Sequence, residues 1–149
     1  LSLKTGILMD YLVHLALFNC HINSNPSSGG GIACVRVSGA GVVPRVDVCI
    51  LIGNLLFPSV GGRGITGEFR DSVISSNIIN GEANGQTGII GIEMTGDAYA
   101  NSITGNLIHG CASGAIHLGS STQDNKGSGN VMRNNGSNIT DAGTGNAVS

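Results

Sequence analysis

Two neighbouring stretches of the chain share one pattern. Residues 71–97 read DSVISSNIINGEANGQTGIIGIEMTGD, and residues 100–122 read ANSITGNLIHGCASGAIHLGSST. Both contain I-x-x-N-x-I, then a polar glycine-rich turn, then a glycine followed by an apolar-x-apolar segment. Because a period of about 20 to 50 residues is typical of solenoids, propellers and arrays, this frame should be sought along the whole chain.

The same frame occurs on both sides of these stretches. Its central polar position, here called the anchor, lies three residues after one apolar residue and two before the next. The anchors are Cys20, Asn54, Asn77, Asn106 and Asn130, at spacings of 34, 23, 29 and 24 residues. At the last anchor Gly127 replaces the first apolar residue, so the frame weakens there.

A second segment with a period of two follows most anchors. Its members are Val35-Arg36-Val37, Gly67-Glu68-Phe69 as a weaker version, Ile92-Glu93-Met94 and Ile116-His117-Leu118. Apolar-x-apolar alternation predicts a strand with one buried face, so the middle residue of each segment should point outward. Each repeat is therefore predicted to hold two or three short strands joined by polar loops of variable length.

Such a repeat favours a parallel β-helix. The leucine-rich frame is missing, no segment has a helical pattern, and a propeller blade needs about 40 residues. In a parallel β-helix successive coils lie about 4.8 Å apart, and equivalent residues form columns along the axis. One coil cannot bury its own apolar face, whereas identical neighbours share an interior and satisfy each other's backbone hydrogen bonds.

The frame resembles the right-handed parallel β-helix repeat of the pectate-lyase-like superfamily, which includes polysaccharide lyases, polygalacturonases and bacteriophage tailspikes. The resemblance covers about Leu12 to Met132. It implies an all-β, right-handed parallel β-helix (solenoid) of about four to five coils over residues 1–136, with residues 137–149 as a polar tail or a weak last coil. It also implies that the anchor asparagines lie in turns and bond backbone groups of neighbouring coils.

Composition narrows the function classes. The 149 residues carry a net charge of -2, and only 11% are charged, so nucleic acid is not an expected partner. No stretch reaches the roughly 18 apolar residues of a membrane helix, so we expect no membrane insertion. Because the chain begins with Leu, we interpret it as a piece of a longer polypeptide.

The four cysteines lack C-x-x-C spacing, which disfavours a zinc site. We interpret them as buried small apolar residues. A disulfide such as Cys20 with Cys49 stays open as an alternative.

Candidate site residues are the outward members of the second segment. Glu68 and Glu93, one coil apart, should lie roughly 5 Å from each other, a separation that suits a retaining glycosidase. His117 would then act as a base, and Arg36 would bind an anionic sugar. The alternative interpretation is a solvated face with mixed charges.

Two further candidates for substrate binding lie in the loop TGDAYAN, which contains Asp97 and Tyr99. Tyr99 offers an aromatic ring for sugar stacking, and the alternative for Asp97 is a turn-forming role. No compact acidic triplet for Ca²⁺ is present, so we predict no metal and no cofactor.

The residues directly after the anchors are apolar: Leu55, Ile78, Leu107 and Val131. They either form an outward ladder for contacts with partner chains or, if the register slips by one residue, face the core. The resemblance to tailspikes implies a homotrimer of side-by-side β-helices.

Three functions follow as expectations. The first is that the chain is part of a phage tailspike-like protein, located in the virion or outside the cell. Such a protein would bind bacterial surface polysaccharide and could also degrade it. The second is part of a secreted polysaccharide lyase or glycoside hydrolase. The third is a structural spacer rod without catalysis.

Overall fold

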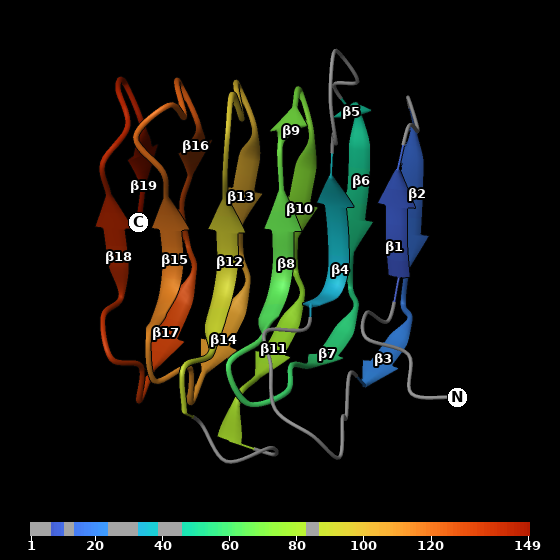
Figure 1. Cartoon of the computed structure of the whole chain (residues 1–149), viewed down its shortest axis with the longest axis vertical. Coiled ribbons are helices and arrows are strands. Elements are labelled where there is room, and N and C mark those ends of the chain that lie inside the picture. Colours follow the sequence, from blue (N-terminus) through green and yellow to red (C-terminus); the bar gives the residue numbers. More distant parts are fainter. Residues whose placement is uncertain (1–6, 11–13, 24–32, 39–45, 83–86) are drawn as a thin grey trace.

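The computed structural model describes residues 7–10, 14–23, 33–38, 46–82 and 87–149. Regular structure in these residues is almost entirely β-strand, and the strands stack side by side as successive coils (Figure 1). Strands β1 to β3 lie at one end of the stack, and β17 to β19 lie at the other.

The coils build three long sheets, each containing one strand per coil. Sheet A contains β1 (Ile7–Asp10), β4 (Ala33–Ser38), β8 (Arg63–Gly67), β12 (Ile90–Met94), β15 (Gly114–Leu118) and β18 (Ile139–Asp141). Sheet B contains β2 (Leu15–Phe18), β6 (Cys49–Ile52), β10 (Val73–Ser75), β13 (Ser102–Thr104), β16 (Lys126–Gly127) and β19 (Ala147–Val148). Sheet C contains β3 (His21–Asn23), β7 (Leu55–Phe57), β11 (Ile78–Asn80), β14 (Leu107–His109) and β17 (Val131–Arg133). A short additional pair joins β5 (Val46–Asp47) to β9 (Phe69–Arg70).

Each strand pairs in parallel with its equivalent in the next coil. Ile79 of β11, for example, is in register with Leu56 of β7 on one side and with Ile108 of β14 on the other. The chain is thus a β-solenoid of about four turns, which confirms the predicted all-β parallel β-helix. Residues 137–149 contain β18 and β19, which extend sheets A and B by one strand each.

The core consists of apolar columns that run from coil to coil. In sheet C, Leu56, Ile79 and Ile108 are fully buried at equivalent positions. Sheets A and B contribute matching columns, for example Ile65, Ile92 and Ile116 in sheet A, and Leu51, Ile74 and Ile103 in sheet B. Stacking therefore buries the apolar face that a single coil would leave in water.

The anchor asparagines form a buried ladder at the bend between sheets B and C. The backbone N–H and the Nδ2 amide of Asn77 both donate to Oδ1 of Asn106, at 3.0 Å each, and Nδ2 also donates to the Leu51 carbonyl at 2.8 Å. Asn54 makes the same contacts to Asn77. Asn fits this position because its amide both donates and accepts.

A second ladder at the bend before sheet B was not predicted. Its members are Ser72, Asn101, Asn125 and Asn146, linked by backbone N–H donation to the side-chain oxygen of the next coil. The sequence nevertheless contains a feature that indicates this ladder, because Ser72, Asn101 and Asn125 each lie five residues before an anchor. The residue before each of them has a positive φ, which turns the chain sharply into sheet B.

All four cysteines are free, so the disulfide alternative is wrong. Cys34, Cys49 and Cys111 are buried, as the packing interpretation predicted, whereas Cys20 is only partly buried. Burial raises the pKa of the Cys49 thiol to about 11 and that of the Cys111 thiol to about 12, because an ionised sulfur would lose its hydration.

The four apolar residues after the anchors point outward. Ile78 and Val131 are 42% and 43% exposed, and the register places Leu55, Ile78, Leu107 and Val131 in one column on the outer face of sheet C. Of the two orientations left open by the sequence, the outward one is confirmed. No helix of the described residues is long and apolar enough to cross a membrane.

Candidate functional site

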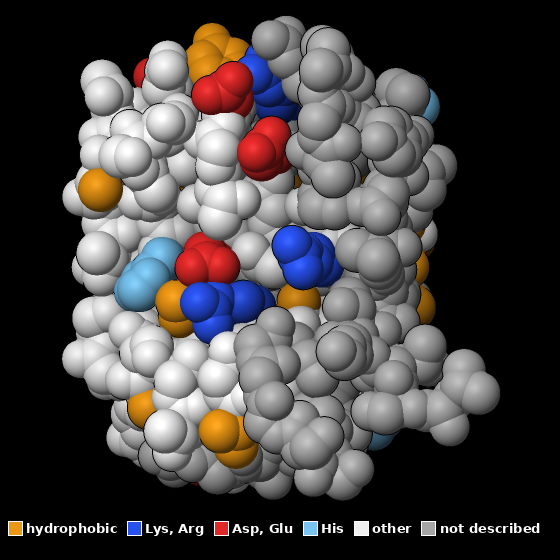
Figure 2. Space-filling model, viewed as in Figure 1, with side chains coloured by type: hydrophobic (Ala, Val, Ile, Leu, Met, Phe, Trp, Pro, Cys, Tyr) orange, Lys and Arg blue, Asp and Glu red, His pale blue; other side chains and the backbone are white. Residues whose placement is uncertain are grey.

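The outer face of sheet A carries a column of polar side chains. Parallel pairing places Arg36, Thr66, Glu93, His117 and Thr140 at equivalent positions of successive coils. Figure 2 shows this face of the molecule, where basic, acidic and histidine side chains gather. Three residues that the sequence predicted for the site, Arg36, Glu93 and His117, therefore share one column.

The register prediction for Glu68 is wrong. Thr66, not Glu68, lies beside Glu93, because the strand segment is Ile65-Thr66-Gly67 rather than Gly67-Glu68-Phe69. Gly67 occupies the inward position that Met94 fills in the next coil, and a Cβ there would come within 2.3 Å of the Val37 carbonyl oxygen. Because a glycine replaces the second apolar residue, the segment Ile65-Thr66-Gly67 does not show the apolar-x-apolar pattern in the sequence.

Glu68 instead lies against the turn that follows β12. A Cβ added at Gly96 would come within 2.1 Å of Glu68 Oε1, so the carboxylate packs on the backbone just before Asp97. The pairing of Glu68 with Glu93 on adjacent coils, on which the glycosidase interpretation rested, is thus absent from the strand register.

Glu93 is held by two donors. Its Oε2 accepts a hydrogen bond from Arg63 Nε at 2.9 Å and another from Thr66 Oγ1 at 3.1 Å. Arg63 is itself anchored, because its Nη1 donates to the carbonyls of Gly61 and Gly62. The Arg63–Glu93 pair is partly buried and neutral overall. The Glu93 carboxylate is therefore held in place by its donors and is not a freely moving group.

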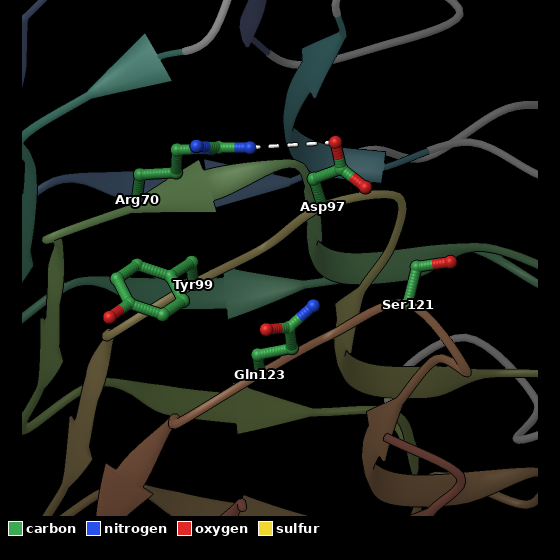
Figure 3. Close-up of a pocket in the computed structure, with 5 residues that line it drawn as sticks. All are labelled: Arg70, Asp97, Tyr99, Ser121 and Gln123. Atoms are coloured by element: carbon green, nitrogen blue, oxygen red, sulfur yellow. Dashed lines mark hydrogen bonds and ion pairs between the residues drawn. The ribbon is translucent and has the colours of Figure 1, made fainter. Parts of the chain in front are cut away.

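A groove of about 300 Å³ lies beside this column, lined by Arg70, Asp97, Tyr99, Ser121 and Gln123. Arg70, Tyr99 and Gln123 come from equivalent positions of three coils, joined by isolated parallel bridges. Asp97 and Ser121 come from the turns that follow β12 and β15. Figure 3 shows the Tyr99 ring between the side chains of Arg70 and Gln123.

The groove combines opposite charges with an aromatic ring. Arg70 Nη2 lies 3.5 Å from Asp97 Oδ2, a long contact at the surface, and Asp97 remains 70% exposed. Such a surface pair contributes at most about 1 kcal/mol to stability. The Asp97 carboxylate is open to a ligand, whereas the Arg70 side chain is only 20% exposed. The Tyr99 side chain, 41% exposed, presents a flat apolar surface next to them.

The structure brings Asp97 and Tyr99 together, as two of the sequence candidates, in this groove. Sequence reasoning missed Arg70, Ser121 and Gln123. The signal for two of them was again position, because Arg70 and Gln123 lie seven residues before an anchor, as Tyr99 does. In the part of the chain that the structure describes, no group of three or more His, Cys, Asp or Glu residues could hold a metal ion.

Comparison with known proteins adds no identification: no family model, no curated protein and no solved structure matches this chain.

Proposed function

We propose that this chain is the β-helix part of a phage tailspike-like protein that binds bacterial surface polysaccharide along the row of Arg70, Tyr99 and Gln123 and the outer face of sheet A. The observation that carries the proposal is the groove of Arg70, Asp97, Tyr99, Ser121 and Gln123. It offers donors, acceptors and an exposed ring in a row parallel to the solenoid axis, which suits a long polymer rich in hydroxyl groups.

The column beside the groove extends the proposed binding face. Arg36 is exposed at one end, and His117 lies in the coil next to Glu93. Arginine side chains on both rows, Arg36 and Arg70, favour a glycan that carries carboxylate groups. Because charges of both signs are mixed, a nucleic acid fits this face less well than a sugar polymer does.

Binding is favoured over cleavage by the surroundings of Glu93. Its Oε2 already accepts two hydrogen bonds, and its neighbour in the strand register is a threonine rather than a second carboxylate. The two-carboxylate arrangement of a glycoside hydrolase therefore has no support at this column. Degradation of the bound glycan remains a secondary proposal, with Glu68, Glu93 and His117 as its candidate residues.

The proposed assembly is a homotrimer, located in a virion or outside the cell. The outward column of Leu55, Ile78, Leu107 and Val131 supports side-by-side contact, because an apolar column exposed on a sheet is a common interaction surface.

A binding assay against bacterial capsular and O-antigen polysaccharides tests the proposal. We expect at least one glycan to bind, Tyr99→Ala and Arg70→Gln to weaken binding about tenfold or more, and Thr104→Ala on sheet B to bind like the parent chain. Loss of stacking and of a charged hydrogen bond are the physical reasons. No binding to any acidic or neutral glycan by the folded chain would reject the proposal and favour a structural rod.

Product release is measured on the same panel. Reducing ends that depend on Glu93 would indicate a hydrolase, and unsaturated-uronate absorbance would indicate a lyase. Glu93→Gln tests the first outcome directly, and Asp97→Asn is its matched variant in the groove. Binding without either product would leave the chain as a receptor-binding module.

A further inference from the structure

The coils beside the groove present outward side chains in pairs, with one inward residue between the members of each pair. The inward residues Phe69, Ala98 and Thr122 are fully buried. Parallel bridges align the second members of the pairs into one row, which is Arg70, Tyr99, Gln123 and Thr144. The first members lie in the preceding turns and are Glu68, Asp97, Ser121 and Ala142. The groove is therefore charged where it begins and neutral further along the axis.

The charge that a ligand meets at the charged end is negative. Asp97 is 70% exposed and Arg70 is 20% exposed, so the carboxylate rather than the guanidinium faces the solvent. Glu68 lies against the backbone at Gly96, directly before Asp97, which brings a second carboxylate to the same turn. Among the residues that the structure describes, none donates a hydrogen bond to Asp97 Oδ1, so this oxygen is open to a donor. This turn therefore attracts a cationic group and repels a carboxylate.

The aromatic ring of the groove suits the same kind of ligand. A cation close to the face of a tyrosine ring is attracted by the negative charge on that face. Tyr99 is 41% exposed, and no basic side chain of the described residues stacks on its ring. Figure 3 shows Tyr99 and Asp97 in the groove, with Ser121 and Gln123 beside them. An open carboxylate and an open aromatic ring in one groove are a combination that recognises ammonium groups.

We propose that the groove selects a sugar with a free, protonated amino group within the polysaccharide that it binds. The inference rests on the proposed glycan-binding function and adds the chemical class of the sugar at one position. The ammonium group donates to Asp97 Oδ1, and the sugar ring stacks on Tyr99. The Gln123 amide and the Ser121 hydroxyl bond hydroxyl groups of the neighbouring sugar. An N-acetylated sugar lacks the required charge, and a carboxylated sugar has the opposite charge.

Carboxylate groups of the same glycan have a different place to bind. Arg36 is exposed on the sheet A column, and it forms no ion pair with any of the described residues. Arg70, in contrast, is directed to Asp97 at 3.5 Å. One polymer satisfies both preferences when it carries amino and carboxylate groups on different sugars.

Calorimetric titration of the 149-residue chain tests the inference. The probes are a short β-linked oligomer of glucosamine and the same oligomer with every amino group acetylated, in slightly acidic buffer that keeps the free amines protonated. We expect the amino form to bind about tenfold or more tightly than the acetylated form. High salt should reduce the difference, because it screens an exposed charge pair. Equal binding of the two forms would overturn the inference.

Asp97→Asn keeps the shape of the groove and removes its exposed charge. It should bind the amino form about tenfold more weakly and leave binding of the acetylated form unchanged. The matched control is Asp124→Asn, at an exposed bend outside the groove where asparagine tolerates the φ of 53°. This control should bind both forms like the parent chain. Equal weakening by the two variants would overturn the inference, because the attraction would then reflect the net charge of the chain.

Further comparisons separate this inference from the proposed function. Binding of a bacterial polysaccharide without any preference for the amino oligomer would overturn the inference and leave the proposed function in place. Binding of the amino oligomer, lost in Asp97→Asn, without binding of any bacterial polysaccharide would support the amino-sugar site and reject the proposed function. An oligolysine of the same charge that binds as tightly as the amino oligomer would overturn the choice of a sugar, because the groove would then recognise charge alone.

Discussion

Sheets A and C use the same parallel pairing from coil to coil, yet their outward columns differ in chemistry. On sheet C the column is apolar from Leu55 to Val131, whereas on sheet A it reads Arg36, Thr66, Glu93, His117 and Thr140. The inward columns of the two sheets are alike, with isoleucine at most positions. Stacking constrains the inward residues, so the difference between the two faces reflects what each face contacts outside the fold.

The largest expected effect on the free energy of unfolding is the difference between substitutions at an inward and an outward position of one strand. Ile79→Ala should destabilise the chain by about 2–5 kcal/mol, because it leaves a cavity in a fully packed column. Ile78→Ala, the neighbouring outward position, should change the free energy of unfolding by less than about 1 kcal/mol. Urea unfolding of both variants measures this, and equal losses would mean that the sheet C ladder is part of the folding core.

The anchor ladder should be nearly as sensitive. Asn106→Leu removes the oxygen that accepts from the Asn77 backbone and amide, and the amide that donates to the Ile74 carbonyl. We expect a loss of about 2–4 kcal/mol, since each buried group left unpaired costs about 1–3 kcal/mol. Asn138→Leu, at an exposed position, is the control. Thermal melting of the two proteins should separate them clearly.

Alkaline pH should weaken the interior selectively. The pKa of Cys111 is raised to about 12 from 9.0, so the folded chain keeps a proton that the unfolded chain releases. The neutral Cys111 thiol therefore contributes fully to the free energy of unfolding below pH 9, and this contribution is lost as the pH rises from 9 toward 12. Denaturant unfolding at pH 8 and at higher pH should therefore show falling stability, and Cys111→Ala should reduce the slope. An unchanged slope would assign the decline to other groups.

One bend residue is strained. Val48 has φ of 62°, a left-handed conformation that is unfavourable for a β-branched residue, whereas Asp71 has φ of 47° at the equivalent bend one coil on. Val48→Asn should stabilise the chain by about 1 kcal/mol, and Asp71→Val should destabilise it by a similar amount. Calorimetric melting checks both signs, and a lower melting temperature for Val48→Asn would contradict the strain argument.

The smallest effect is expected on sheet A. Arg63→Met breaks the ion pair with Glu93, which is partly exposed, and should cost no more than about 1 kcal/mol. It should nevertheless alter glycan binding if sheet A is the binding face, because Glu93 would lose the group that orients it. Loss of stability with unchanged binding would assign the pair to structure alone.

The strand frame around each anchor was predictable, because an anchor between two apolar residues recurs at fixed offsets, as asparagine between two isoleucines at Asn77 and Asn106 and with leucine at Asn54. Ile74, Asn77 and Ile79 and their equivalents occupy the predicted positions. The frame failed at β8, where Gly67 occupies an inward position that alternation reserves for an apolar residue. Periodicity alone cannot detect that substitution, because its cause is the nearby Val37 backbone in another coil.

The groove was only half predictable. Tyr99 is conspicuous in a chain poor in aromatic residues, and Asp97 lies two residues before it in the same loop. Arg70 and Gln123 are not conspicuous by residue type, and only their constant position, seven residues before an anchor, relates them to Tyr99. The parallel bridges that join the three positions show that they form one row.

The repeat in the amino-acid sequence is enough to predict the solenoid, because it encodes which residues neighbouring coils must share: the apolar columns and the asparagine bends. Which outward residues meet depends instead on how the coils stack. Stacking converts separations of more than twenty residues into contacts between neighbouring coils, and a shift of one or two residues changes the partner. Glu93 therefore pairs with Arg63 and Thr66, while Glu68 lies against the next turn.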